Sequence, residues 1–327
     1  MAEFLNPDGL VLSDHYAETM NGTVLPFLKA QRKELSVTGA GGCQLACDRF
    51  DAPSPRGTVL VLHGFTECAE KFSEIIFSLL RNGYSVAAYD QRGHGRSGRD
   101  PRITDPSLTH VDRFQDYVGD LEAVRDQVLR RMPKPWYLFA HSMGGAVSLL
   151  FLEAHPEDFA KAAFCAPMIA PQRGGIPLAV GEAMCMAAKC LGQGRKRIPM
   201  SRPWSGPEEF ETSCATGRER FDWYDALRVA TEAYHNNGPT YSWTLEGFRV
   251  TKRLLAPGQP EKVRLPVRIY TAADDNQVIP EAQEAMTRRL PMAERRVVAG
   301  AKHEIYRSPD GVLFPWWREI LDFFAEE

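Results

Sequence analysis

A serine at residue 142 stands where the local pattern changes from strand to helix. The run 136–140 before it is apolar and aromatic, whereas the apolar residues after it recur at helical spacing. A tight turn of this kind lifts the hydroxyl above the sheet, and the helix behind it favours developing negative charge. The pattern Ala-His-Ser-Met-Gly differs from Gly-x-Ser-x-Gly only in its first residue. It predicts that Ser142 is a nucleophile; the alternative is that Ser142 only caps the helix.

A serine nucleophile needs a general base. Beyond residue 171 the chain has two histidines, His235 and His303. His303 follows the last expected strand after a turn that contains glycine, which places it at the carboxyl edge of a parallel sheet. His235 lies in an irregular stretch, so His303 is the predicted base. His141, beside the serine, is expected to have a structural role.

The acid that orients the base should follow the preceding strand, because the chain order of such sites is serine, acid, histidine. The stretch VRIYTAADDNQVIP offers Asp274 and Asp275 there. Counting a Gly-x-x-Asp turn from the strand end places Ala272 at the glycine and Asp275 at the acid. Asp274 is the alternative.

An acyl-transfer site also needs two backbone N–H groups that stabilise an oxyanion. One should come from the residue after the nucleophile, Met143. The other should come from the loop after the first buried strand, HGFTE, where Phe65 is the expected donor. The side chain matters little at either position because the donor is main chain.

Alternating strands and helices must position these residues. Gly41-Gly42 separates two short strands within residues 35–50, which predicts a hairpin. The alternation that follows predicts an α/β fold with a mostly parallel sheet covered by helices on both faces. The expected strands are 57–64, 84–90, 136–140, 161–168, 267–273 and 294–300, and the expected helices are 70–83, 111–132, a stretch after Ser142, about 280–290, and 315–326.

The chain divides at the places where this alternation is absent. Residues 171–262 contain many prolines and glycines and are predicted to form an inserted, mostly helical lid (cap) domain. Residues 1–34 precede the first strand as an N-terminal extension. The predicted hydrolytic core is then 35–170 together with 263–327.

Composition excludes several classes of protein. Of the 327 residues, 44% are hydrophobic and 25% charged, and the formal net charge of −3 gives no reason to expect a nucleic-acid partner. There is neither a signal-peptide pattern nor an apolar run long enough to span a membrane. The seven cysteines are scattered and odd in number, which favours a reducing cytoplasm over disulfide pairing. Cys43 and Cys47 have no matching second pair, so a zinc site is not expected.

With these residues in hand, the chain resembles the serine hydrolases of the α/β-hydrolase superfamily, specifically the lysophospholipases and monoacylglycerol lipases. The resemblance covers nearly all the chain from about residue 35, through VLHGFTE, YDQRGHGRSGR, HVDRFQDYVGDL, AHSMGGAV and GAKHEIY. GPTYSW (238–243) is closer to the bacterial lysophospholipase L2 group. The resemblance implies an α/β-hydrolase fold with no metal or organic cofactor. It also implies a triad and two oxyanion donors: Ser142, Asp275 and His303, with Phe65 and Met143.

The substrate implied by this resemblance is a small acyl ester of a single-chain lipid, either a lysophospholipid or a monoacylglycerol. The apolar, methionine-rich stretch 176–192 could hold an acyl chain or pack the lid core. Two interpretations of the basic run GRKR (194–197) remain: it makes a transient contact with a membrane surface, or it is a solvated loop. No oligomeric state is predicted.

Two other functions compete with the lipid esterase. One is a peptidase similar to the proline iminopeptidases, which a cluster of lid carboxylates around a free amine would favour. The candidates are Glu208, Glu209, Glu211, Glu219 and Asp222. The other is a non-catalytic ligand-binding protein on the same scaffold, which a broken triad would favour.

Overall fold

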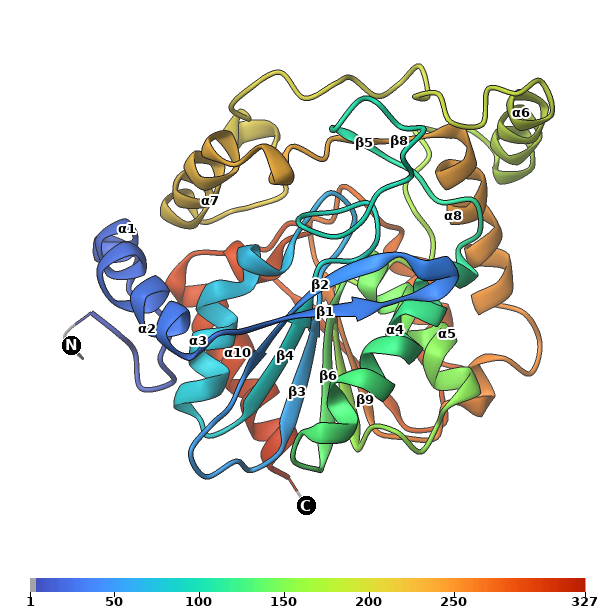
Figure 1. Ribbon diagram of the computed structural model, residues 1–327. Coiled ribbons are helices and arrows are strands. Elements are labelled where there is room, and N and C mark those ends of the chain that lie inside the picture. The colour runs from blue at the N-terminus through green and yellow to red at the C-terminus, as the bar shows by residue number, and fades with distance from the viewer. Residues whose placement is uncertain (1–3, 327) are drawn as a thin grey trace.

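An eight-stranded sheet forms the centre of the computed structural model, which describes residues 4–326 (Figure 1). The strand order is β1-β2-β4-β3-β6-β7-β9-β10, antiparallel from β1 to β4 and parallel from β4 to β10. The predicted mostly parallel sheet is confirmed. The strands are β1 (Lys33–Thr38), β2 (Gln44–Phe50), β3 (Thr58–Leu62), β4 (Ser85–Tyr89), β6 (Trp136–His141), β7 (Lys161–Cys165), β9 (Val267–Ala272) and β10 (Ala293–Val298).

Helices cover both faces of this sheet, so its central strands are buried on both sides. Every residue of β3, β4 and β6 is buried, which explains why these strands read as continuous apolar runs. One buried cluster joins the sheet to α4 (Gln115–Gln127) and α5 (Met143–Ala154). The other joins it to α3 (Ser73–Arg81) and α10 (Asp310–Ala325). The short α9 (Pro280–Thr287) lies between β9 and β10.

Helix boundaries differ from those predicted from sequence, most of all at the starts of two helices, and the expected helix 70–83 is divided into a short helix Ala69–Phe72 and α3. Helix α4 begins at Gln115, not at 111, and Phe114 just before it donates its N–H to Glu246 at 2.9 Å. Helix α10 begins at Asp310 and contains Pro315, which the pattern placed at its start. The proline lacks one backbone N–H, but the helix buries Trp317 and Phe324 against the sheet, and that burial outweighs one lost hydrogen bond.

The residues before β1 pack onto the body of the molecule as short helices, including α1 (Tyr16–Thr19) and α2 (Leu25–Gln31). Residues 1–3 of the predicted extension lie outside the described residues. Arg220, buried on α7 (Arg218–Ala230), connects this segment to the core. Its guanidinium donates to both carboxylate oxygens of Glu74 at 3.0 Å, to the Val11 carbonyl at 2.7 Å and to Asp310 at 2.7 Å.

Between β7 and β9 the chain leaves the sheet and forms α6 (Leu178–Cys190), α7, β8 (Gly238–Pro239) and α8 (Tyr241–Leu254). These elements lie over the carboxyl edge of the parallel strands (Figure 1). β8 pairs with β5 (Leu108–Thr109) from the core, and Thr240 caps α8 by accepting the Trp243 N–H. The division into a core and a lid at 171–262 stays our interpretation of this arrangement. In the described chain, no helix is both long and apolar enough to span a bilayer.

Candidate active site

Ser142 occupies a strained turn between β6 and α5. Its φ of 48° lies in the left-handed region that residues with side chains rarely adopt. The next turn of chain passes so close to its neighbours that only glycine fits. A Cβ on Gly144 would lie 2.7 Å from the His63 carbonyl oxygen, and one on Gly145 would lie 2.6 Å from the Pro167 Cβ. The glycines of the motif therefore permit the close packing that holds the turn.

The His303 side chain lies between Ser142 and Asp275. Its Nε2 is 2.9 Å from the Ser142 Oγ, and its Nδ1 is 2.9 and 3.0 Å from the two Asp275 carboxylate oxygens. Asp275 also accepts the N–H groups of Gln277 and Val278 at 2.8 and 3.0 Å. Burial raises the pKa of this carboxyl, but His303 and the two N–H groups together hold it below its ordinary value.

The geometry separates the two candidate acids. The Asp275 carboxylate is buried against His303, whereas Asp274 is exposed, and its backbone N–H donates to the Ala301 carbonyl at 3.1 Å. His235 does not join this arrangement. Its ring stacks on Trp204 instead, with ring centroids 3.5 Å apart. The structure thus brings together Ser142, Asp275 and His303.

Both expected oxyanion donors are adjacent to the serine. Met143 is the first residue of α5, and Phe65 lies on the loop after β3, whose Gly64 would carry a Cβ only 3.0 Å from the Ser142 Cβ. Within residues 4–326 neither N–H donates a hydrogen bond to the protein. Two unengaged N–H groups beside a serine hydroxyl can stabilise an oxyanion. Thr66, next on the loop, has a φ of 61° that turns the chain there.

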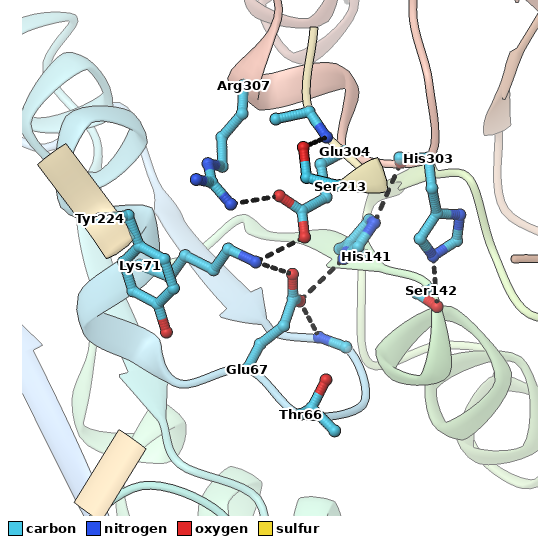
Figure 2. Close-up of polar contacts among 12 residues, drawn as sticks. Thr66, Glu67, Lys71, His141, Ser142, Ser213, Tyr224, His303, Glu304 and Arg307 are labelled. Atoms are coloured by element: carbon cyan, nitrogen blue, oxygen red, sulfur yellow. Dashed lines mark hydrogen bonds and ion pairs between the residues drawn. The ribbon is translucent and has the colours of Figure 1, made fainter. Parts of the chain in front are cut away.

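A buried carboxylate, Glu67, fixes this loop. It accepts hydrogen bonds from His141 Nδ1 at 2.8 Å and Lys71 Nζ at 3.0 Å (Figure 2). It also accepts the Gly64 N–H and the Tyr306 hydroxyl, each at 2.5 Å. Burial acts to raise its pKa, but His141 and Lys71 outweigh that effect and hold the pKa well below the ordinary value. Glu67 therefore stays ionised and holds the loop after β3 against the short helix Ala69–Phe72 and the loop after β10.

His141 extends the same network to the base. Its Nδ1 faces the Glu67 carboxylate, and its Nε2 faces the His303 carbonyl oxygen at 3.2 Å. Both neighbours are acceptors, so the ring can donate to either of them. His141 therefore has the structural role of connecting the loop after β3, which carries Glu67, to the backbone of His303.

A cavity of about 440 Å³ opens above Ser142 between the sheet edge and the inserted segment. Its walls are predominantly apolar. The Phe65 ring meets Trp243 with centroids 4.0 Å apart. Met184 lines the cavity and Met186 does not, as expected for residues two apart on a helix. The apolar lining includes Met168, Ile176, Met184, Trp243, Phe248 and Val278.

Comparison with known proteins identifies the family. Residues 53–310 match the family described as "Serine aminopeptidase, S33". The chain belongs to this family of serine hydrolases. Lysophospholipase L2 of Escherichia coli is 30% identical over 310 residues, covering 90% of this chain and 88% of that protein. The monoacylglycerol lipase of Mycolicibacterium smegmatis is 27% identical over 176 residues, covering 53% of this chain and 59% of that lipase.

Solved structures agree on the fold of this hydrolase. A soluble variant of the monoglyceride lipase of Saccharomyces cerevisiae superposes with a TM-score of 0.70 at 19% identity, over 90% of this chain and 96% of that one. A thermostable carboxyl esterase of Bacillus coagulans gives 0.69 at 19% identity, over 90% and 98% of the two chains. The predicted α/β-hydrolase fold is confirmed.

Sequence reasoning missed the charged residues behind the oxyanion loop. Lys71 donates to Glu304 at 2.6 Å and Glu304 accepts Arg307 at 2.6 Å, in a buried chain of charges that begins at Glu67. Each of these residues is of a charged type that usually lies at the surface, in an amphipathic stretch, so no sequence pattern indicated that it is buried. The only available signal was Glu67 in HGFTE, three residues after the glycine whose N–H it accepts.

The basic run 194–197 is largely engaged within the protein. Arg195 donates to Asp100 and Asp112 at 3.0 Å each, and Arg197 donates to Asp105 at 2.8 Å. In the part of the chain that the structure describes, Asp100 and Asp112 with His110 are also the one group close enough to share a metal ion. Arginines already neutralise both carboxylates there, so the group fits an ion-pair cluster.

Proposed function

We propose that this hydrolase cleaves the carboxylic ester of a single-chain lipid through an acyl-enzyme formed on Ser142. The observation that carries the proposal is a serine–histidine–aspartate arrangement at the base of an apolar cavity. Relatives named lysophospholipase and monoacylglycerol lipase support the same class of ester. The apolar walls suit an acyl chain better than they suit a peptide.

The proposed mechanism uses the contacts of the resting site. His303 takes the Ser142 proton as the hydroxyl attacks the ester carbonyl, and Asp275 stabilises the imidazolium that results. The N–H groups of Phe65 and Met143 stabilise the oxyanion, each contributing about 3 kcal/mol. His303 then protonates the leaving alcohol, and the same residues direct a water molecule to cleave the acyl-enzyme.

A peptidase is the second candidate, favoured by the description of the family and by carboxylates in the inserted segment. Those carboxylates do not surround the cavity above Ser142. Glu208 pairs with Arg228, and Asp222 pairs with Arg218 on the exposed face of α7. A free amine would therefore find no carboxylate cluster from this set in the apolar cavity.

A panel of substrates separates the two candidates. We expect long-chain p-nitrophenyl esters and monoacylglycerols to be hydrolysed with much higher kcat/KM than aminoacyl amides. A fluorophosphonate probe should label the native chain and leave Ser142→Ala unlabelled. A higher kcat/KM for the amides would favour the peptidase over the lipid esterase. Labelling of Ser142→Ala would show that the nucleophile is another residue.

We further propose a reducing, cytoplasmic location for this protein. All seven cysteines are unpaired, and Cys47, Cys68, Cys165 and Cys185 are buried. Mass spectrometry of protein isolated under denaturing, alkylating conditions should show seven alkyl adducts. A lower count that reduction restores would indicate an oxidising compartment.

A transient contact with lipid surfaces is part of the same proposal. Exposed apolar side chains lie along α6 and at its end, at Val180, Met184 and Leu191, and Met200 and Met184 also line the cavity. Vesicle flotation tests this contact: the protein should float with vesicles, and Leu191→Asp should weaken the association. Met292→Asp is the matched control, because Met292 is a similarly exposed methionine at the start of β10. Equal flotation of both variants would refute the contact.

A further inference from the structure

The run YDQRGHGRSGR (89–99) has no part in the mechanism described above, yet it lies against the loop after β3. It follows β4, which is parallel to β3 and pairs with it, so the residues after the two strands meet at one edge of the sheet. His63 and Gln91 are both buried at this edge, with exposed fractions of 1% and 0%. Their contacts determine how the loop presents the expected oxyanion donor, Phe65.

Hydrogen bonds fix the position of the proton on the His63 ring. Its Nε2 lies 2.8 Å from the backbone nitrogen of Gln91, and a backbone N–H can only donate, so Nε2 is an unprotonated acceptor. Burial lowers the pKa of His63, which keeps the ring neutral at pH 7. A neutral ring carries one proton, and that proton is therefore on Nδ1. The Nδ1–H donates to the Gly64 carbonyl oxygen at 2.7 Å.

The two peptide groups that precede Phe65 are held at each polar atom except one. In the first, the His63 carbonyl oxygen accepts the Gln91 side-chain amide at 2.5 Å, and the N–H of Gly64 donates to a carboxylate, also at 2.5 Å. In the second, the Gly64 carbonyl oxygen accepts the His63 Nδ1–H, and the N–H of Phe65 donates to no residue within 4–326. A trans peptide group is planar, and its N–H points opposite to its C=O. Holding the Gly64 carbonyl therefore sets the direction of the Phe65 N–H.

We propose that His63 and Gln91 are positioning residues that aim the Phe65 N–H at the oxyanion of the reacting ester. His63 acts through its hydrogen bond to the peptide group that carries this N–H. Gln91 acts twice, because its backbone selects the Nδ1–H form of His63 and its side chain holds the preceding carbonyl. Neither side chain lines the cavity above Ser142, so neither touches the substrate. The proposal rests on the proposed acyl transfer at Ser142, where a donor that is already aimed needs no reorganisation during the reaction.

Two amide substitutions separate the aim of the peptide group from the packing of the ring. In His63→Asn the amide nitrogen can replace Nδ1 and donate to Gly64, but no acceptor remains for the N–H of Gln91. In His63→Gln the amide oxygen can replace Nε2, but the donor to Gly64 is lost. Asparagine is the smaller side chain and leaves the larger void, so His63→Asn should unfold at the lower temperature. The two variants thus rank in opposite orders for stability and for the proposed aim.

A third variant tests Gln91 on its own. Gln91→Met removes the side-chain donor to the His63 carbonyl and keeps the backbone N–H. The matched control is Thr58→Val, which also removes one buried hydrogen bond from a side chain to a carbonyl, at the opposite end of β3. Each protein is assayed for kcat and KM with p-nitrophenyl butyrate. Each is also tested for inhibition by an alkyl trifluoromethyl ketone, whose adduct with Ser142 would carry an oxyanion.

We expect kcat to fall about a hundredfold in His63→Gln with KM changed by less than about threefold, because a misdirected donor loses most of its effect on the oxyanion. His63→Asn should retain a kcat at least about fivefold above that of His63→Gln, although it is the less stable variant. Gln91→Met should lose about tenfold in kcat, and Thr58→Val less than about twofold. The inhibition constant of the trifluoromethyl ketone should rise in each variant by the factor by which kcat/KM falls.

Nitrogen-15 chemical shifts should show that His63 of the native protein is neutral with its proton on Nδ1. A native ring protonated on Nε2 would overturn the proposal. A kcat of His63→Asn below the stated margin over His63→Gln would also overturn it, because activity would then follow stability. If neither His63 variant folds, Gln91→Met decides, and a kcat equal to that of Thr58→Val would be the contrary result. A native protein that neither hydrolyses the ester nor binds the ketone would instead refute the proposed esterase.

Discussion

Glu67→Gln is the most informative single change, because one buried carboxylate supports both sides of the reaction site. A glutamine retains one oxygen and replaces the other with a donor. The four donors that meet this carboxylate belong to Gly64, His141, Lys71 and Tyr306. Breaking a buried charge network by removing one partner costs about 3–5 kcal/mol. For a chain of this size we expect the midpoint of thermal unfolding to fall by roughly 4–7 °C.

The effect on catalysis should exceed what lost stability explains. Gly64 positions the Phe65 N–H, and His141 positions the backbone of His303. Misplacing one oxyanion donor lowers kcat by about 10²–10³-fold. We therefore expect kcat for p-nitrophenyl butyrate at 20 °C to fall by about a hundredfold with KM nearly unchanged. Leu321→Ala on α10 is the control, because it should cost about 2–5 kcal/mol of stability without touching the site.

Nuclear magnetic resonance supplies the readout that a structural role alone would not change. In the native protein the proton between His141 Nδ1 and Glu67 should exchange slowly with solvent. Glu67→Gln should speed that exchange, because an amide oxygen is a weaker acceptor than a carboxylate. Retention of kcat within about threefold in the folded variant, or an unchanged exchange rate, would refute this reasoning.

Three further changes test other parts of the structure. Asp275→Asn should lower kcat on the order of 10⁴-fold by misorienting the imidazole, and Asp274→Asn far less; the reverse ranking in steady-state assays would exchange their roles. Met184→Glu should penalise long p-nitrophenyl esters much more than acetyl esters, because each methylene buried in the cavity is worth up to about 0.8 kcal/mol. Met186 lies outside the cavity, so Met186→Glu should not penalise long esters in this way. A flat dependence of kcat/KM on acyl-chain length would rule out a lipid substrate. Burial raises the pKa of Glu153 to about 7, so its contribution to stability is present below the unfolded value of 4.5 and is lost as the pH rises through 7. Urea unfolding should therefore show Glu153→Gln gaining roughly 3 kcal/mol over the native protein between pH 4 and pH 8, and a constant difference would contradict the raised pKa.

The sequence was sufficient for the sheet and for the positions of Ser142 and His303. Strand ends and tight turns are local features, and local spacing reports them. The choice between Asp274 and Asp275 was not local, because it depends on which carboxylate the loop after β9 turns toward His303. Counting residues along the turn favoured Asp275, whose carboxylate lies 2.9 Å from His303 Nδ1.

The buried charged network could not be predicted from sequence patterns, for a different reason. Glu67, Lys71, Glu304 and Arg307 come from two segments more than 200 residues apart in the chain, and each alone resembles a solvated surface residue. Only the packing of the short helix Ala69–Phe72 against the loop after β10 buries them together. The same holds for Arg220, whose burial depends on three other elements.

Because Arg220 is buried, helices α6 and α7 of the inserted segment are anchored to the rest of the molecule to different degrees. Helix α7 is held to the N-terminal segment, α3 and α10 by four hydrogen bonds from Arg220 to three partners, so its amides should exchange with solvent only when much of the molecule opens. Helix α6 has mostly exposed side chains and packs chiefly on α8, so its amides should exchange far sooner. Access to Ser142 would then be controlled by the half of the segment that carries α6, while the half that carries α7 stays in place.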